Sequence, residues 1–230
     1  MNKESASQFF KRLAARLPQP KTELVYTSPY TLLVAVILSA QATDAGVNKA
    51  TKDLFKTAST PEAMVKLGLN GLKRFIKTIG LYRGKAKNII AMSELLLERH
   101  GGQVPRSRED LESLPGVGRK SANVILNTVY GDPVIAVDTH VFRVANRTGL
   151  APGKTVLEVE EKLLKAVPEK YLPHAHHWLV LHGRYVCKAR VPECPICPVA
   201  DVCAYPNKTK ELPALKRGAG VIPQPSARKR

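Results

Sequence analysis

The chain contains four cysteines, all near its C-terminal end, at Cys187, Cys194, Cys197 and Cys203, with six, two and five residues between them. Thiolates bind zinc and iron, and prolines between these cysteines stiffen the loops that would bring them to one centre. Structural zinc sites usually show two short gaps, whereas only one gap here is short. The spacing favours an iron–sulfur cluster, and a structural zinc or two disulfides are the alternatives. Because no secretory signal precedes them, a reducing compartment is expected, which disfavours disulfides.

A second group of residues, Leu114-Pro-Gly-Val-Gly-Arg-Lys120, joins two expected helices through a turn that holds two glycines. Gly116 and Gly118 permit a positive φ and let backbone N–H groups approach an anion without a Cβ in the way. The turn leads into a helix N-terminus, whose free N–H groups and dipole favour phosphate. With Arg119 beside it, this helix–hairpin–helix pattern predicts a grip on the DNA backbone that reads no sequence. A tight turn without a ligand is the alternative.

Two further side chains could carry chemistry. Lys120 is expected about two residues into its helix, where the dipole and desolvation disfavour an ammonium and favour a nucleophilic amine. A solvated phosphate contact is its alternative role, although Arg119 suits that role better. Asp138 follows the apolar run 134–137 and is expected to cap the next helix. A capping carboxylate stays ionised, so it could also stabilise a cationic sugar or move protons.

The net charge is +17, from 36 Lys and Arg against 19 Asp and Glu. Such an excess attracts polyanions, and nucleic acid is favoured over an acidic membrane because no amphipathic lipid-binding pattern is present. From Asn207 onward the chain carries seven Lys and Arg against one Glu, with Gly, Pro and Ser and no apolar periodicity. Residues 207–230 are therefore expected to form a basic, flexible tail.

The periodicity of apolar residues, with caps and glycine stops, predicts an all-α protein. The longest apolar stretch, Leu32–Leu38, is too short to cross a bilayer and is expected to lie in a buried helix. With no targeting segment in view, a cytoplasmic, nucleoid-associated protein of prokaryotic type is expected. Helices are predicted at about 30–40, 44–56, 60–68, 72–78, 84–100, 107–113, 119–130, 138–148, 155–167 and 172–186.

Taken together, these residues resemble the endonuclease III family of DNA glycosylases with abasic-site lyase activity. The resemblance covers Leu32 to about Tyr205. Its motifs here are Leu38-Ser-Ala-Gln-Ala-Thr-Asp44, Ile79-Gly-Leu-Tyr82, the hairpin Leu114–Lys120, Val137-Asp-Thr-His-Val-Phe-Arg143, His182-Gly-Arg184 and the four cysteines.

The resemblance implies a repair enzyme that acts on double-stranded DNA with oxidised or ring-damaged pyrimidines or abasic sites, probing it as a monomer and flipping the damaged nucleotide into a pocket. Lys120 would be the nucleophile that forms a Schiff base, and Asp138 its electrostatic partner. Gln41 would fill the gap left by the extruded base, and Leu81 would wedge the opposite strand, although a helix-end polar residue and a core leucine are their alternative roles. The four cysteines would hold a 4Fe–4S cluster that shapes a basic loop near Lys188 and Arg190.

The family architecture implies two helical domains that flank a DNA-binding cleft. Residues 22–132 would form a six-helix barrel that carries the hairpin, and residues 1–21 with 133–206 would form the cluster domain. The three histidines His174, His176 and His177 are expected to be packed or solvated, because their helical spacing points them in different directions.

Three rival functions remain. The adenine-specific branch of the superfamily uses an acid in an early helix, but 34–42 contains no Asp or Glu. A monofunctional glycosylase would leave Lys120 without a purpose. A non-catalytic helix–hairpin–helix DNA-binding protein explains the charge and the glycines, but it does not explain the joint presence of Lys120 and Asp138.

Overall fold

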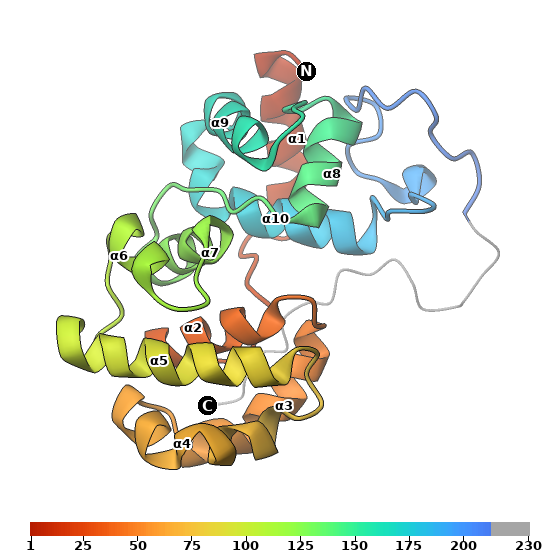
Figure 1. Ribbon diagram of the computed structural model, residues 1–230. Helices are drawn as coiled ribbons and strands as arrows, with labels where there is room; N and C mark the ends of the chain where they lie inside the picture. The colour runs from red at the N-terminus through yellow and green to blue at the C-terminus, as the bar shows by residue number, and fades with distance from the viewer. Residues whose placement is uncertain (213–230) are drawn as a thin grey trace. The chain divides into compact units, whose positions relative to one another are not determined.

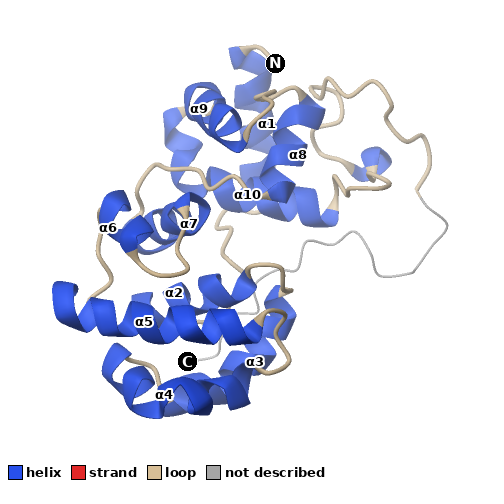
Figure 2. Ribbon diagram, in the orientation of Figure 1, coloured by secondary structure: helices blue, strands red, loops and turns tan. Residues whose placement is uncertain are grey.

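The computed structural model describes residues 1–212, and every regular element in this range is helical (Figure 2). The all-α prediction is confirmed. No helix of the described chain is both long and apolar enough to span a bilayer. Contacts divide the chain into two compact units: Thr22–Asp132, and Met1–Lys21 together with the described residues from Pro133 onward. Each unit is described by itself below.

The unit Thr22–Asp132 is built around one buried helix, α2 (Pro29–Ser39). Every residue from Tyr30 to Leu38 is buried, as expected for a helix that is apolar on all sides. Neighbouring helices α3, α5 and α7 pack against it (Figure 1). The remaining helices of the unit are α3 (Asp44–Thr57), α4 (Pro61–Ile76), α5 (Tyr82–His100), α6 (Arg108–Ser113) and α7 (Arg119–Tyr130).

Local sequence signals set most of these helix starts. Ser28 and Thr31 form a reciprocal capping box, with Pro29 in the first turn. Thr43, Thr60 and Ser107 each accept a hydrogen bond from the backbone N–H three residues on, so they cap α3, α4 and α6. The pair of helices expected at 60–68 and 72–78 is found as α4, which is broken at Gly68 by a left-handed φ of 70°.

The second unit contains α1 (Lys3–Arg16), α8 (Thr139–Thr148), α9 (Val156–Ala166) and α10 (Leu172–Tyr185), with short 3₁₀ turns η1 (Glu169–Tyr171) and η2 (Cys194–Ile196). The sequence did not predict α1 as a helix. Its Phe10 stacks on Tyr171 and lies near Trp178, whose indole N–H donates to the Leu17 carbonyl at 2.8 Å. Asn2 caps this helix by accepting from the Ser5 N–H at 2.8 Å, and long-range packing of Phe10 adds to that local signal.

Close packing of α8 on α10 depends on Gly183. A Cβ at this position would lie 3.0 Å from the Cβ of His140 and 3.3 Å from its carbonyl oxygen, which is tighter than most Cβ contacts and would require α8 to shift slightly. The glycine of the His182-Gly-Arg184 motif thus lets the first turns of α8 approach the last turns of α10. As a result, the helix that Asp138 caps runs beside the segment that leads into Cys187.

The predicted tail from residue 207 lies mostly outside the described residues. At its start, the Thr209 hydroxyl donates to the Pro192 carbonyl at 2.6 Å and accepts from the Cys194 N–H at 3.2 Å. The ordered chain therefore continues past the boundary expected at 206, and Thr209 belongs to the loop that carries the cysteines.

Candidate active site and cysteine cluster

The hairpin between α6 and α7 has the form that the sequence predicted. Leu114 and Val117 are buried and anchor the turn. Gly116 has a φ of +83°, and a Cβ there would meet the Asn88 side chain at 3.0 Å, so both its conformation and its packing require glycine. At Gly118 the φ is −108°, so the positive φ allowed for this residue is not used. Its missing Cβ instead leaves open space in front of the helix.

The N-terminus of α7 is open to an anion. Its N-cap residue is Gly118, which has no side chain, and no side-chain cap bond is found at this helix start within the described residues. Arg119 is exposed at this end, and Lys120 is half-buried one residue further on. A phosphate at this position would meet the N–H donors of a helix start, the positive end of the helix dipole and a neighbouring guanidinium. The hairpin, Arg119 and Lys120 thus form one surface of the unit Thr22–Asp132.

Asp138 caps α8 in the second unit, as predicted. Its Oδ1 accepts from the N–H groups of His140 and Val141, both at 2.8 Å. Both bonds use the same oxygen, and no described residue donates to Oδ2. The cap therefore fixes the direction of a half-buried carboxylate while one of its oxygens stays available. Lys120 and Asp138 lie in different units. Their joint role in one site is a prediction from the sequence.

Gln41 and Leu81 are the two non-glycine residues of the described chain with a left-handed φ, at 55° and 58°. Gln41 follows the end of α2, and Leu81 is the residue before α5. Leu81 exposes 67% of its surface, so the alternative that it is a core residue is wrong. Both side chains therefore stand on strained turns of one unit, where strain commonly marks a functional position.

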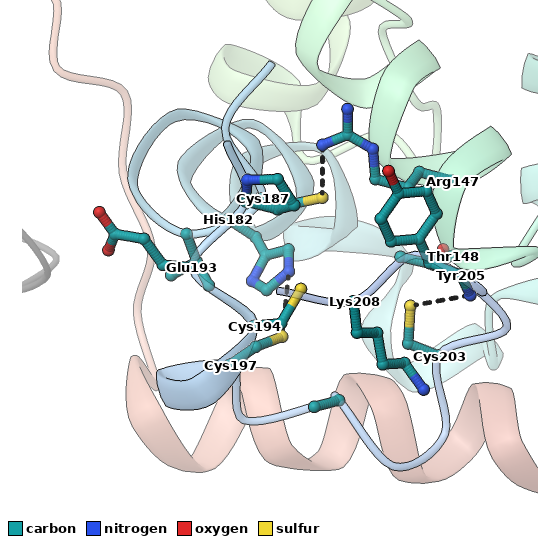
Figure 3. Close-up of a pocket in the computed structure, with 13 residues that line it drawn as sticks. Arg147, Thr148, His182, Cys187, Glu193, Cys194, Cys197, Cys203, Tyr205 and Lys208 are labelled. Carbon is teal, nitrogen blue, oxygen red and sulfur yellow. Dashed lines mark hydrogen bonds between the residues drawn. The ribbon is translucent and has the colours of Figure 1, made fainter. Parts of the chain in front are cut away.

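The four cysteines line one pocket at the end of α10 (Figure 3). All four are free thiols, and Cys187 is the most buried of them. Burial raises the pKa of Cys187 and raises the pKa of Cys197 to about 11, so burial by itself favours neutral thiols. A bound metal centre would reverse this preference by taking the thiolate form.

The four thiols form one candidate set of metal ligands. They surround a common pocket, and none of them pairs with another. Within residues 1–212, no three His, Cys, Asp or Glu side chains lie close enough to share one metal ion. Four thiolates are the ligand set of an iron–sulfur cluster and also of a structural zinc.

Polar groups around the pocket lie against three of the sulfurs, and two of these groups, from Arg147 and Tyr205, are donors (Figure 3). Arg147 Nη1 lies 3.6 Å from Cys187 Sγ, the Tyr205 N–H lies 3.5 Å from Cys203 Sγ, and His182 Nε2 lies 3.8 Å from Cys197 Sγ. Hydrogen bonds to sulfur stabilise the thiolates of a bound cluster. These contacts therefore favour the thiolate form of the cysteines.

Two arginines of α8 hold the loop that carries Cys187, and the sequence did not single out either of them for this role. Arg143 donates to the carbonyls of Gly183 and Cys187 at 2.7 and 3.1 Å. Arg147 donates to the carbonyls of Lys188 and Ala189 at 2.6 and 2.9 Å. Their spacing of four residues on one helix face was a usable signal, but only the fold shows what that face meets.

Lys188 has a different role from the DNA contact expected in its neighbourhood. Its ammonium is paired with the carboxylate of Glu193, which is 4% exposed, and this ion pair closes the loop between Cys187 and Cys194. Arg190 is exposed on the same loop. On this loop the Lys188 ammonium is therefore held by Glu193, whereas Arg190 faces solvent.

The histidines of α10 are packed, as expected for His176 and His177. His176 Nδ1 lies 2.9 Å from the Ala136 carbonyl, two residues before Asp138. His177 is 8% exposed, and neither of its ring nitrogens has a hydrogen-bond partner among the described residues. Burial, together with the nearby His176 and His174, lowers the pKa of His177 to about 3.

This histidine should make stability depend on pH. In the folded protein its pKa lies below the ordinary value of about 6.5, so the unfolded chain binds the proton first and stability falls as the pH drops below about 6.5. Between about pH 7.5 and pH 5 the loss from His177 amounts to about 2 kcal/mol. Unfolding by urea at both pH values should show a smaller loss for His177→Leu than for the wild type. An equal loss in both proteins would mean that His177 does not cause it.

The fold and the hairpin first define a class. Residues 34–169 match the HhH-GPD superfamily of base excision DNA repair proteins. The chain is 58% identical over 210 residues to Endonuclease III of Haemophilus influenzae, an alignment that covers 91% of this chain and 100% of that protein. It is also 58% identical to Endonuclease III of Escherichia coli strain K12, over 90% of this chain and 99% of the relative. The chain therefore belongs to the endonuclease III family within this superfamily.

A solved structure agrees with this assignment. The chain superposes on a trapped covalent intermediate of Endonuclease III and DNA, an estranged-adenine complex, with a TM-score of 0.83 and 44% sequence identity. The match covers 89% of this chain and 96% of that one. The expected family is confirmed.

Proposed function

We propose that this protein is a bifunctional DNA N-glycosylase and abasic-site lyase of base excision repair, acting on duplex DNA with oxidised or ring-damaged pyrimidines. The observation that carries the proposal is Lys120, half-buried in the first turn of α7 beside an uncapped anion-binding helix end. Its amine stands where a DNA backbone would be gripped, in a chain of the endonuclease III family.

The proposed reaction begins with the neutral amine of Lys120. Its lone pair forms a bond to C1′ of the sugar, and the glycosidic bond breaks. The base leaves with the electrons of the glycosidic bond and takes up a proton. Opening of the sugar ring gives a Schiff base between Lys120 and C1′. Loss of a C2′ proton then expels the 3′ phosphate by β-elimination, and water releases the amine.

Asp138 is proposed to assist these steps electrostatically. Positive charge develops on the sugar as the base leaves, and an ionised carboxylate with one free oxygen stabilises it. The same oxygen can accept and return a proton during Schiff-base formation. Because the two backbone bonds to Oδ1 hold the carboxylate in place, little reorganisation is needed when the charge appears.

Gln41 and Leu81 are proposed to stabilise the DNA around the extruded nucleotide. Extrusion leaves a gap in the base stack, and filling it offsets part of the cost of unstacking. Gln41, exposed on its turn, would fill that gap with polar atoms. Leu81, with two thirds of its surface exposed, would insert as an apolar wedge on the opposite strand.

Cys187, Cys194, Cys197 and Cys203 are proposed to hold a 4Fe–4S cluster. When bound, the cluster supplies a rigid cross-link between α10 and the C-terminal loop, and the proposed reaction requires no electron transfer. The residues of this chain do the rest: Arg147 and the Lys188–Glu193 ion pair shape the loop, and Arg190 faces solvent on it.

The cluster can be checked by chemical analysis. The purified protein is expected to show broad visible absorption and to contain iron and acid-labile sulfide in equal amounts. Cys197→Ala should lose both, because its sulfur lines the cavity. A colourless wild-type protein that contains stoichiometric zinc would contradict the assignment.

The function itself is tested by incubating the protein with a duplex that contains thymine glycol or an abasic site in the presence of borohydride. Reduction of the Schiff base converts it into a stable protein–DNA adduct. The expected result is such an adduct together with strand cleavage. Absence of an adduct from the wild type would reject the lyase activity. A panel of other damaged bases would then define the lesion preference.

A further inference from the structure

A buried lysine joins the two strained turns that carry Gln41 and Leu81. Lys85 lies in the first turn of α5 and is 6% exposed. Its Nζ donates to the carbonyls of Leu38 and Ala40, at 2.9 and 2.5 Å. Its backbone N–H donates to the carbonyl of Leu81 at 3.1 Å. Lys85 is thus hydrogen-bonded both to the backbone that leads into Gln41 and to the backbone of Leu81.

The position of the ammonium matches the charge of the helix end that it meets. Carbonyls of the last turn of a helix lack internal donors and form the negative end of the helix dipole. Lys85 supplies donors to this end of α2 from outside the helix. The chain leaves α2 directly after these carbonyls, and Gln41 is the next residue. The ammonium therefore fixes the point from which the Gln41 turn begins.

The two turns are also adjacent through their backbones. A Cβ built on Gly80 would lie 3.8 Å from the Gln41 carbonyl oxygen. On the other side, the Leu81 carbonyl accepts from the N–H groups of Gly84 and Lys85, both at 3.1 Å. These bonds hold the left-handed residue Leu81 at the start of α5. A shift of Lys85 would therefore displace the backbone of both turns.

Simple packing does not explain a lysine at this position. Burying an ammonium costs desolvation energy, and here burial lowers the pKa of Lys85. A methionine has similar length and would fill the same space without that cost. Left-handed conformations at Gln41 and Leu81 are strained, and the surrounding contacts must maintain them. What the ammonium adds is directed hydrogen bonding to the α2 carbonyls.

We propose that Lys85 is a positioning residue that sets the separation of the Gln41 and Leu81 turns before DNA binds. The proposal rests on the DNA roles assigned above to these two side chains. Pre-ordered turns do not have to be fixed during binding, so the free energy of their contacts remains available for stabilising an extruded nucleotide. Lys85 acts through Gln41 and Leu81 and does not itself contact the DNA in this proposal.

The test compares Lys85→Met with wild type on two duplexes, one intact and one with a tetrahydrofuran abasic analogue opposite 2-aminopurine. Two quantities are measured. One is the dissociation constant for the intact duplex divided by that for the abasic-analogue duplex, and the other is the fluorescence increase of the 2-aminopurine on binding. Lys85→Met should lower the ratio about tenfold and reduce the fluorescence increase, while affinity for the intact duplex is kept. Lys87→Met, which removes an exposed lysine from the same helix, should keep the wild-type ratio.

A second background separates positioning from general damage. In a protein with Gln41→Ala and Leu81→Ala, adding Lys85→Met should not lower the ratio further, because the side chains through which it acts are already gone. A further tenfold loss in this background, or an unchanged ratio in the single variant, would overturn the proposal. If Lys85→Met does not fold, Lys85→Gln carries the same test, because its amide keeps a donor and should give an intermediate ratio.

The outcome is independent of the test of the enzymatic function. If the wild type forms no borohydride-trapped adduct, the lyase activity fails. If the adduct forms and Lys85→Met keeps the wild-type ratio of dissociation constants, only the positioning role of Lys85 fails.

Discussion

Lys120→Ala is expected to abolish the borohydride-trapped adduct and to lower strand cleavage at abasic sites by about 10⁴-fold or more. The reason is chemical: no other amine of the hairpin occupies the first turn of α7, and without a covalent nucleophile the Schiff base cannot form. Binding to a duplex with a tetrahydrofuran analogue should be largely kept, because the hairpin N–H groups that grip phosphate remain. Gel analysis of trapped adducts and a binding isotherm measure both effects.

The matched control for this variant is Arg119→Ala. This change removes the neighbouring cation and leaves the amine in place. It should weaken DNA binding and reduce its salt dependence by about one phosphate contact, while a saturating concentration of protein still gives the adduct. An adduct that persists in Lys120→Ala would place the nucleophile elsewhere in the chain.

Asp138→Asn is expected to lower turnover by about 10²-fold or more while DNA binding is retained. Asparagine and aspartate cap helices about equally well, so the substitution keeps the two bonds from His140 and Val141 and removes the charge. The stability should therefore change by less than about 1 kcal/mol. Single-turnover kinetics with a thymine-glycol duplex, together with urea unfolding, measure the two quantities.

Asp138→Ala provides the comparison that isolates the cap. It removes the charge and the cap together, so it should lose turnover to the same extent and cost about 1 kcal/mol more stability than the asparagine variant. Wild-type turnover in Asp138→Asn would leave Asp138 with a structural role only. A loss of turnover in the alanine variant alone would point to the same conclusion.

The all-helical fold was predictable because its signals are local. Caps at Ser28, Thr43, Thr60 and Ser107 each bond to the N–H three residues on, and the stop at Gly68 breaks α4 where the pattern changes. Asp138 was correctly predicted as a cap on the same grounds. Helix α1 was missed although local signals mark it, because Asn2 caps it and Ala6, Phe9, Phe10 and Leu13 are spaced as one helix face. Only the fold shows that this face packs on Tyr171 and Trp178, more than 150 positions away.

In the candidate site, too, some features were predictable from residue types and others only from the fold. Residue types and spacing at Lys120, at Gly116 and at the four cysteines were sufficient to suggest nucleophile, hairpin and cluster, because that chemistry depends on which atoms a side chain carries. The proposed roles of Gln41 and Leu81 came from the family resemblance. Their left-handed backbone and the exposure of Leu81 became visible only with the fold.

The sequence by itself determined which elements and reactive groups this protein has. These are the helices other than α1, the strong positive charge, an amine at a helix start and four thiols in a short segment. Only the tertiary structure decided which groups support them. Arg143 and Arg147 hold the Cys187 loop, Glu193 takes Lys188, and Lys85 ties α2 to α5. These contacts join residues far apart in the chain, and the direction of a long, flexible side chain depends on partners that only folding brings near.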